Sequence, residues 1–108
     1  MDRYLPQDGP SGFSSLTAIS QFLRIQGRVQ GVGYRAWFCE RAMAMGLCGW
    51  VRNREDGAVE ALVAGDEVSV KDMVAAAGSG PRLARVDQVD RQPAEMPLRT
   101  DFRIERTV

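Results

Sequence analysis

The first repeating pattern in the chain is an alternation of apolar and polar residues that starts near Gln21. Leu23, Ile25 and Val29 share one parity, whereas Arg24, Gln26 and Arg28 have the other. Side chains two residues apart lie on the same face of a strand, so the pattern is typical of a strand with one buried face. We expect this strand to cover residues 21–28.

Two later stretches have apolar residues at helical spacing. The first has its apolar face at Tyr34, Trp37, Phe38, Ala42 and Met45. It predicts a helix over 34–45 that ends at Gly46. The second stretch repeats the spacing at Val70, Met73, Val74 and Ala77. It predicts a helix that Asp66 caps and that Gly78 and Gly80-Pro81 terminate.

Further strand patterns occur at 47–53, 58–64 and 83–90, and a last short one occurs at 102–104. The segment Arg54-Glu55-Asp56-Gly57 predicts a hairpin turn between the first two of these, in which glycine supplies a positive φ. The resulting order is β-α-β-β-α-β. This order predicts an α+β fold of the ferredoxin-like type, a sandwich in which two helices cover one face of an antiparallel sheet.

Composition places these elements in one domain. The chain has 108 residues, of which 44% are hydrophobic and 26% charged, values typical of a globular protein. Residues 1–20 contain several Pro, Gly and Ser and predict a flexible arm, followed by the domain at 21–108. No apolar run approaches the roughly 20 residues of a membrane span. Since Met1–Pro10 lacks the apolar core of a signal peptide, we expect a cytoplasmic protein with no membrane partner.

The ionisable residues exclude several kinds of chemistry. Lys plus Arg and Asp plus Glu both number 14, and this zero net charge argues against nucleic acid as a partner. The chain has no His, which excludes His-based triads and His metal sites. Its two cysteines, Cys39 and Cys48, form no C-x-x-C motif, so no zinc site is expected. We expect reduced thiols, because Cys39 falls in a predicted helix and Cys48 in the following strand.

The segment from Gly27 to Arg35, with the sequence GRVQGVGYR, joins the first strand to the first helix. Its glycines let successive N–H groups converge, and a helix N-terminus adds a partial positive charge. The planar guanidinium of Arg35 can contact two phosphate oxygens at once. These features predict an anion-binding loop, although a turn of simple geometry stays open on the loop alone. A dinucleotide fingerprint is excluded, because Val51 stands where an acidic residue is required.

A second informative stretch runs from Gly49 to Glu60 and places Asn53 at the end of a strand. Asn also commonly begins turns, and this alternative stays open for Asn53 considered alone. For Trp50 we expect a place in the core. The nearby arginines are expected to be solvated, namely Arg28, Arg52 and Arg54.

Taken together, these two segments closely resemble the acylphosphatase family. Residues 27–35 match its signature G-R-V-Q-G-V-G-[FY]-R, and residues 49–60 match G-W-V-x-N-x-x-D-G-x-V-E at the family's separation. Residues 80–86 are similar to the family's G-P-x-x-A-x-V motif, and residues 102–104 to its C-terminal strand. The resemblance spans residues 21–104. It implies a ferredoxin-like fold and a hydrolase that converts acyl phosphates to carboxylate and inorganic phosphate.

The resemblance also implies residue roles. Arg35 corresponds to the substrate-binding arginine and Asn53 to the asparagine that orients the attacking water. The phosphate oxygens would be held by the backbone of Val29, Gln30, Gly31, Val32, Gly33 and Tyr34. Tyr34 replaces the commoner Phe, and the arm has no counterpart in the minimal domain.

The implied chemistry needs no further groups. The carboxylate that leaves has a conjugate acid with a pKa of about 4, so it departs without a proton and no His is required. We therefore expect no metal and no cofactor. We also expect a monomer that takes a small acyl phosphate as substrate, with inorganic phosphate as product and inhibitor.

Three other functions compete with this one. A similar domain could serve carbamoyl phosphate in a larger maturation enzyme, against which the length of 108 residues argues. A binding module could hold an anion without turnover, and an assay with benzoyl phosphate would distinguish it. An RNA-binding domain of this fold needs exposed aromatic pairs and a basic face. The first two strands carry only Phe22 and Trp50 as aromatic residues, and the net charge is zero.

Overall fold

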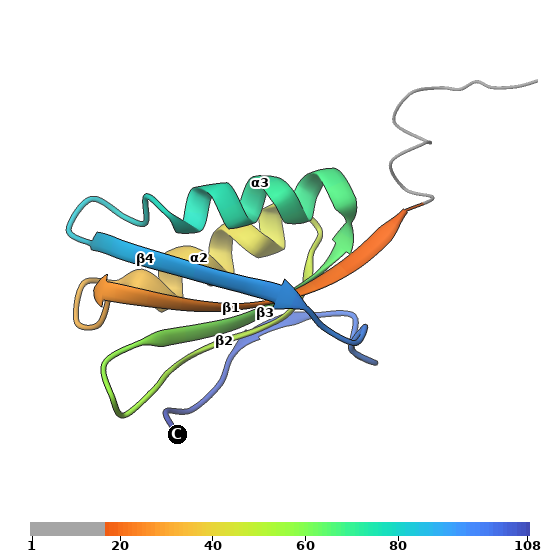
Figure 1. The fold of residues 1–108 in the computed structure, drawn as a ribbon. Helices are drawn as coiled ribbons and strands as arrows, with labels where there is room; N and C mark the ends of the chain where they lie inside the picture. The colour runs from red at the N-terminus through yellow and green to blue at the C-terminus, as the bar shows by residue number, and fades with distance from the viewer. Residues whose placement is uncertain (1–16) are drawn as a thin grey trace, which may run out of the picture.

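A computed structural model describes residues 17–108, which form a five-stranded sheet with two helices on one of its faces (Figure 1). The elements in chain order are β1 (Ala18–Arg28), α2 (Tyr34–Ala44), β2 (Cys48–Asn53), β3 (Val59–Asp66), α3 (Glu67–Ala77), β4 (Arg85–Pro93) and β5 (Phe102–Ile104). The predicted α+β class and ferredoxin-like order are confirmed. The predicted arm falls largely on residues 1–16, outside the described residues.

The strands lie in the order β4-β1-β3-β2-β5. The first four strands of the chain pair antiparallel, as expected, whereas β5 pairs parallel with β2. The sheet is therefore mixed and not wholly antiparallel. The reason is that β4 and β5 lie at opposite edges, and the chain reverses direction between them, so that β5 runs the same way as β2.

Two strand boundaries differ from the predicted ones. β1 begins at Ala18, three residues before the predicted start, and its first residues pair with the end of β3. β4 covers Arg85–Pro93 and not 83–90, because Ala84 N–H donates to the Pro81 carbonyl at 3.0 Å and closes a turn there. Leu83 is 64% exposed in this turn. Because Leu83 is apolar, the sequence pattern placed the start of this strand too early in the chain.

The predicted ends of the helices are confirmed. α2 ends before Gly46, whose φ of 72° lies in the left-handed region that favours glycine. Asp66 caps α3, since its side chain accepts a hydrogen bond from Ser69 N–H at 3.4 Å. Gly57 in the β2–β3 hairpin has a φ of 101°, as the turn prediction required.

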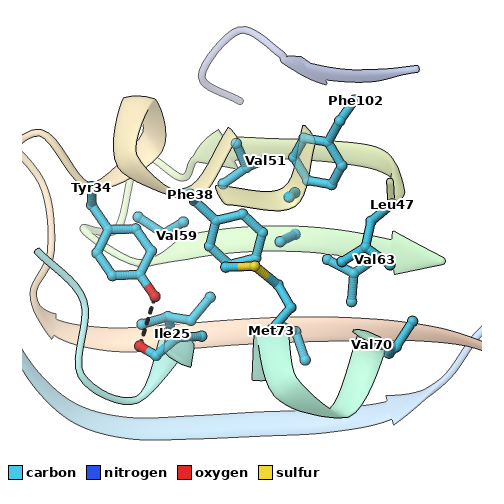
Figure 2. Packing of buried hydrophobic residues seen from close by; sticks show 14 of the residues in the cluster. Ile25, Tyr34, Phe38, Leu47, Val51, Val59, Val63, Val70, Met73 and Phe102 are labelled. Carbon is cyan, nitrogen blue, oxygen red and sulfur yellow. Dashed lines mark hydrogen bonds between the residues drawn. The ribbon is translucent and has the colours of Figure 1, made fainter. Parts of the chain in front are cut away.

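The hydrophobic core lies between the sheet and the two helices (Figure 2). Its sheet side is formed by alternate residues of neighbouring strands, including Leu23, Ile25, Val51, Val59, Ala61 and Val63. Its helix side comes from Tyr34, Phe38, Ala42, Val70, Met73 and Ala77. The ring of Phe38 stacks on Phe102 with centroids 5.8 Å apart, which attaches the short β5 to α2.

Trp50 corrects one prediction, because it is not in this core. Its neighbours Gly49 and Val51 are buried on the helix side, so Trp50 lies on the opposite, open face of the sheet. There it meets Phe22 edge to face, with centroids 6.2 Å apart.

The two cysteines lie where the pattern placed them. Cys39 is in α2 and Cys48 begins β2, and both are part-buried free thiols. Burial, and to a lesser extent the charge of Glu40, raises the pKa of the Cys39 thiol. Among residues 17–108, no helix is long and apolar enough to cross a membrane.

Candidate active site

The loop from Val29 to Gly33 leaves β1 and enters α2 at the same end of the sheet as the β2–β3 hairpin (Figure 1). Gly31 has a φ of 73° and Gly33 a φ of 81°. A Cβ at either position would meet nothing within 4 Å, so the backbone conformation, and not space, favours glycine here. These two left-handed residues give the loop its tight curl.

The start of α2 carries no local negative charge. Gly33 is its N-cap, and no side chain of the described part of the chain caps the helix. Its first turn has no acidic residue, and the first backbone bond is from Trp37 N–H to the Gly33 carbonyl at 3.1 Å. The first N–H groups and the positive end of the helix dipole therefore suit an anion.

A cavity of about 230 Å³ lies against this loop. It is lined by Val29, Gln30, Gly31, Gly33, Tyr34, Arg35, Ala36, Asn53 and Ile104. The structure thus brings Arg35 and Asn53 together with the loop. Of the predicted site residues, only Val32 does not line the cavity, because its side chain packs against the core.

Two lining residues, Ala36 and Ile104, were not predicted from the sequence. Ala36 directly follows Arg35 in the first turn of the predicted helix, so its place in the cavity lining could have been inferred from the sequence. Ile104 comes from β5, and its position depends on the parallel pairing with β2, which local pattern does not reveal. Together they add an apolar wall beside the polar groups.

Arg35 differs from three of the arginines near the site, Arg24, Arg52 and Arg54. Among residues 17–108 it forms no ion pair, whereas Arg24 contacts Asp56 at 2.6 Å. Arg52 and Arg54 contact Glu60, at 2.9 and 3.6 Å. The charge of Arg35 is therefore available at the cavity, while its neighbours are engaged by carboxylates.

The sequence predicted solvated side chains for Arg28, Arg52 and Arg54, and of these only Arg28 is exposed. The side chain of Arg52 is 27% exposed, because its guanidinium lies 4.5 Å from the Trp50 ring centroid and also pairs with Glu60. Non-local ion pairs of this kind cannot be deduced from the residues' own positions in the chain.

The hairpin that follows Asn53 is held in shape by Asp56. Its carboxylate accepts from Ala58 N–H at 3.0 Å and from the Arg24 guanidinium at 2.6 Å. The Ala58 hydrogen bond, and secondly Arg24, lowers the pKa of Asp56 below its ordinary value. Asp56 therefore stabilises the turn, and it is not among the residues that line the cavity.

Asn53 is the last residue of β2 and pairs with Val59 of β3. Its main-chain carbonyl accepts from Val108 N–H at 3.3 Å. Its side-chain Oδ1 is buried and has no hydrogen-bond partner in the described part of the chain. A buried carbonyl oxygen without a partner is unfavourable and uncommon, which distinguishes Asn53 from an ordinary turn residue.

Tyr34 connects the end of the loop to α3. Its hydroxyl donates to the Ala77 carbonyl at the end of α3 at 2.8 Å (Figure 2). Burial raises the pKa of the Tyr34 hydroxyl, so this group stays protonated and keeps donating. The loop is thereby joined to the second helix.

The fold and the cavity define a class of small α+β protein, in which a glycine-rich loop and a helix start form a surface suited to an anion. The family profile described as "Acylphosphatase" matches residues 21–104. The chain belongs to the acylphosphatase family, whose members are hydrolases acting on acid anhydrides.

Relatives in sequence and structure agree with this assignment. The acylphosphatase of Rhodopseudomonas palustris is 55% identical over 74 residues, which are 68% of this chain and 75% of that protein. The crystal structure of acylphosphatase from Bacillus subtilis has a TM-score of 0.78 at 32% identity, covering 81% of this chain and 98% of that one. Full-length HypF in a phosphate- and nucleotide-bound form has a TM-score of 0.77 at 25% identity, covering 84% of this chain and 12% of that one.

Proposed function

We propose that this protein hydrolyses acyl phosphates in the cavity between the β1–α2 loop and the end of β2. The observation that carries the proposal is that Arg35 and Asn53, from separate elements, line one cavity in a member of the acylphosphatase family. Family membership supports the class of reaction, and the geometry of the cavity supports the assignment of roles.

The phosphate group binds to the backbone of residues 29–34 and to Arg35. Convergent N–H groups and a guanidinium provide donors on several sides of the group. In phosphoryl transfer the charge on the transferred oxygens is redistributed in the transition state, and preorganised donors stabilise it. Arg35 suits this role because no carboxylate among residues 17–108 neutralises it.

Asn53 orients the attacking water. The Asn53 side chain lines the cavity, and its amide group offers both a carbonyl acceptor and NH₂ donors, so it can hydrogen-bond to a water there. Placing the water in line with the bond that breaks lowers the barrier by removing the need to orient it during the reaction.

The reaction forms one bond to phosphorus and breaks another. The water oxygen bonds to phosphorus while the bond from phosphorus to the acyl oxygen breaks, and the bonding electrons leave with the carboxylate. The conjugate acid of that carboxylate has a pKa of about 4, so no acid is needed. The proton of the water passes to a phosphate oxygen, since neither a carboxylate nor an imidazole of residues 17–108 lines the cavity.

The reaction requires no metal ion and no cofactor in this proposal. The loop N–H groups and Arg35 supply the positive charge that a cation would otherwise provide. The oxygen ligands that Mg²⁺ prefers are poorly represented, because no carboxylate in the described part of the chain lines the cavity.

A direct assay tests the function. The purified chain is expected to hydrolyse benzoyl, acetyl or carbamoyl phosphate in the presence of EDTA, with inorganic phosphate as a competitive inhibitor. Binding of phosphate without turnover of any acyl phosphate would favour a binding module instead. Inhibition by EDTA that Mg²⁺ reverses would overturn the metal-free assignment.

We also propose that the protein acts as a monomer in the cytoplasm, with the predicted arm at 1–20 preceding the catalytic domain at 21–108, except that residues 18–20 already belong to β1. Light scattering at the assay concentration tests the oligomeric state, and cell fractionation tests the location.

A further inference from the structure

The side chain of Gln30 leaves the phosphate loop and reaches the β2–β3 hairpin. Its Nε2 donates to the Arg54 carbonyl at 2.8 Å and to the Ala58 carbonyl at 2.9 Å. Both partners are carbonyl oxygens, so the amide must present its NH₂ group to them. Gln30 thus joins two segments that are more than twenty residues apart in the chain.

The two carbonyls are those that close the hairpin. The Arg54 carbonyl also accepts from Gly57 N–H at 3.1 Å, and the Ala58 carbonyl accepts from Arg54 N–H at 2.8 Å. Gln30 therefore binds the base of the hairpin, at the residue that directly follows Asn53. From the other side, Val108 N–H donates to the Asn53 carbonyl at 3.3 Å.

Such a link matters because of the order of the strands. The loop and Arg35 follow β1, whereas Asn53 ends β2, and β3 lies between these two strands. Adjacent strands are about 4.8 Å apart, so the two halves of the cavity stand on strands separated by about twice that spacing. Twist or bending of the sheet would change the distance between Arg35 and Asn53.

We propose that Gln30 is a positioning residue, whose side chain fixes the Asn53 hairpin relative to the phosphate loop across β3. The inference rests on the proposed function. Both hydrogens of its amide group are engaged by carbonyls of the hairpin, so we assign this side chain to positioning Asn53, although Gln30 itself lines the cavity. Only the main chain of Gln30 belongs to the phosphate-binding loop.

The first test is Gln30→Leu, which removes the donors and retains similar bulk. We expect kcat to fall about 10-fold or more, because small displacements of a reacting group reduce the rate by up to about 10²-fold. KM and the inhibition constant for phosphate should change little, since the loop backbone is retained. The matched control is Gln88→Leu, the same change at an exposed position of the edge strand β4, where the side chain bonds Asp90 and is remote from the hairpin, and it should leave kcat unchanged.

The second test is a double-mutant cycle with Asn53→Ala. If Gln30 acts through Asn53, Gln30→Leu should lower kcat in the wild-type chain and have no further effect in the Asn53→Ala chain. The proposal would be overturned if Gln30→Leu lowered kcat by the same factor in both chains. It would also be overturned if Gln30→Leu raised KM and left kcat unchanged. Normal turnover by Asn53→Ala would overturn it as well.

Gln30→Glu keeps the test decisive if Gln30→Leu does not fold. It places a carboxylate against two carbonyl oxygens, which raises the pKa of the new carboxyl group, and protonation restores one donor. The ratio of its kcat to that of the wild type should therefore rise as the pH is lowered from 7 to 5, and a flat ratio would contradict the proposal. Failure of the wild-type chain to hydrolyse any acyl phosphate would instead reject the proposed function.

Discussion

Arg35 and Asn53 show how a residue's role depends on partners far away in the chain. The sequence places both residues in recognisable segments, but it does not show that Arg24, Arg52 and Arg54 pair with carboxylates while Arg35 does not. Nor does it show that Asn53 Oδ1 is buried without a partner among residues 17–108. These differences arise from pairing between strands, which brings distant side chains together.

Tyr34→Phe tests the contact between the loop and α3. The change removes the hydrogen bond from the hydroxyl to the buried Ala77 carbonyl and retains the ring in the core. We expect the free energy of unfolding to fall by about 1–2 kcal/mol, the usual effect of leaving one buried group unpaired. Urea denaturation measures this value. Since the hydroxyl is turned away from the cavity, kcat should stay near that of the wild type, and a loss of activity without a loss of stability would contradict this assignment.

At the scale of elements, most of the fold could be predicted from pattern. Alternation and helical spacing indicated β1, α2, β2 and α3, because each of these has one buried face, and the largely apolar run of the central strand β3 indicated that strand. The start of β4 and the pairing of β5 could not be predicted in this way. β4 is mostly exposed and so has a weak pattern, and β5 is held by non-local contacts with β2 and Phe38.

Gly49 in β2 provides the test at this scale. Its φ is 135°, and a Cβ there would lie 1.8 Å from the Leu62 carbonyl oxygen of the neighbouring strand. Gly49→Ala should therefore lower the free energy of unfolding by about 3 kcal/mol or more, because both backbone strands would have to move.

The matched control is Gly46→Ala. Gly46 also has a positive φ, of 72°, but a Cβ there would meet nothing within 4 Å. Only the left-handed conformation is then penalised, by about 1–2 kcal/mol. Equal destabilisation of the two variants in urea denaturation would contradict the close approach inferred at Gly49.

At the scale of the whole molecule, the cavity is built at one end of the sheet, from the β1–α2 loop, the end of β2 and β5 (Figure 1). The sequence predicted most of its lining, because the loop and the β2–β3 hairpin carry continuous motifs. It could not predict Ile104 or the bridging side chain of Gln30, which depend on the order of the strands.

Removal of the first 16 residues tests the limits of the catalytic domain. The shortened chain should begin at Thr17, because the Thr17 carbonyl accepts from Glu67 N–H at 3.0 Å and β1 starts at Ala18. We expect kcat and KM to match those of the full chain, since the cavity lies at the other end of β1. A folded shortened chain with reduced kcat would show that the arm contributes to the site.

The central claim is that Arg35 holds the phosphate group as its charge is redistributed, and Arg35→Lys tests it most directly. Lysine keeps the charge and loses the planar pair of donors. We predict that kcat/KM for benzoyl phosphate falls about 10²–10³-fold, the usual result of removing one preorganised donor. The melting temperature should not fall, because lysine keeps the charge and Arg35 forms no ion pair among residues 17–108 that the change would break. A folded Arg35→Lys variant with near-normal kcat/KM would contradict the account.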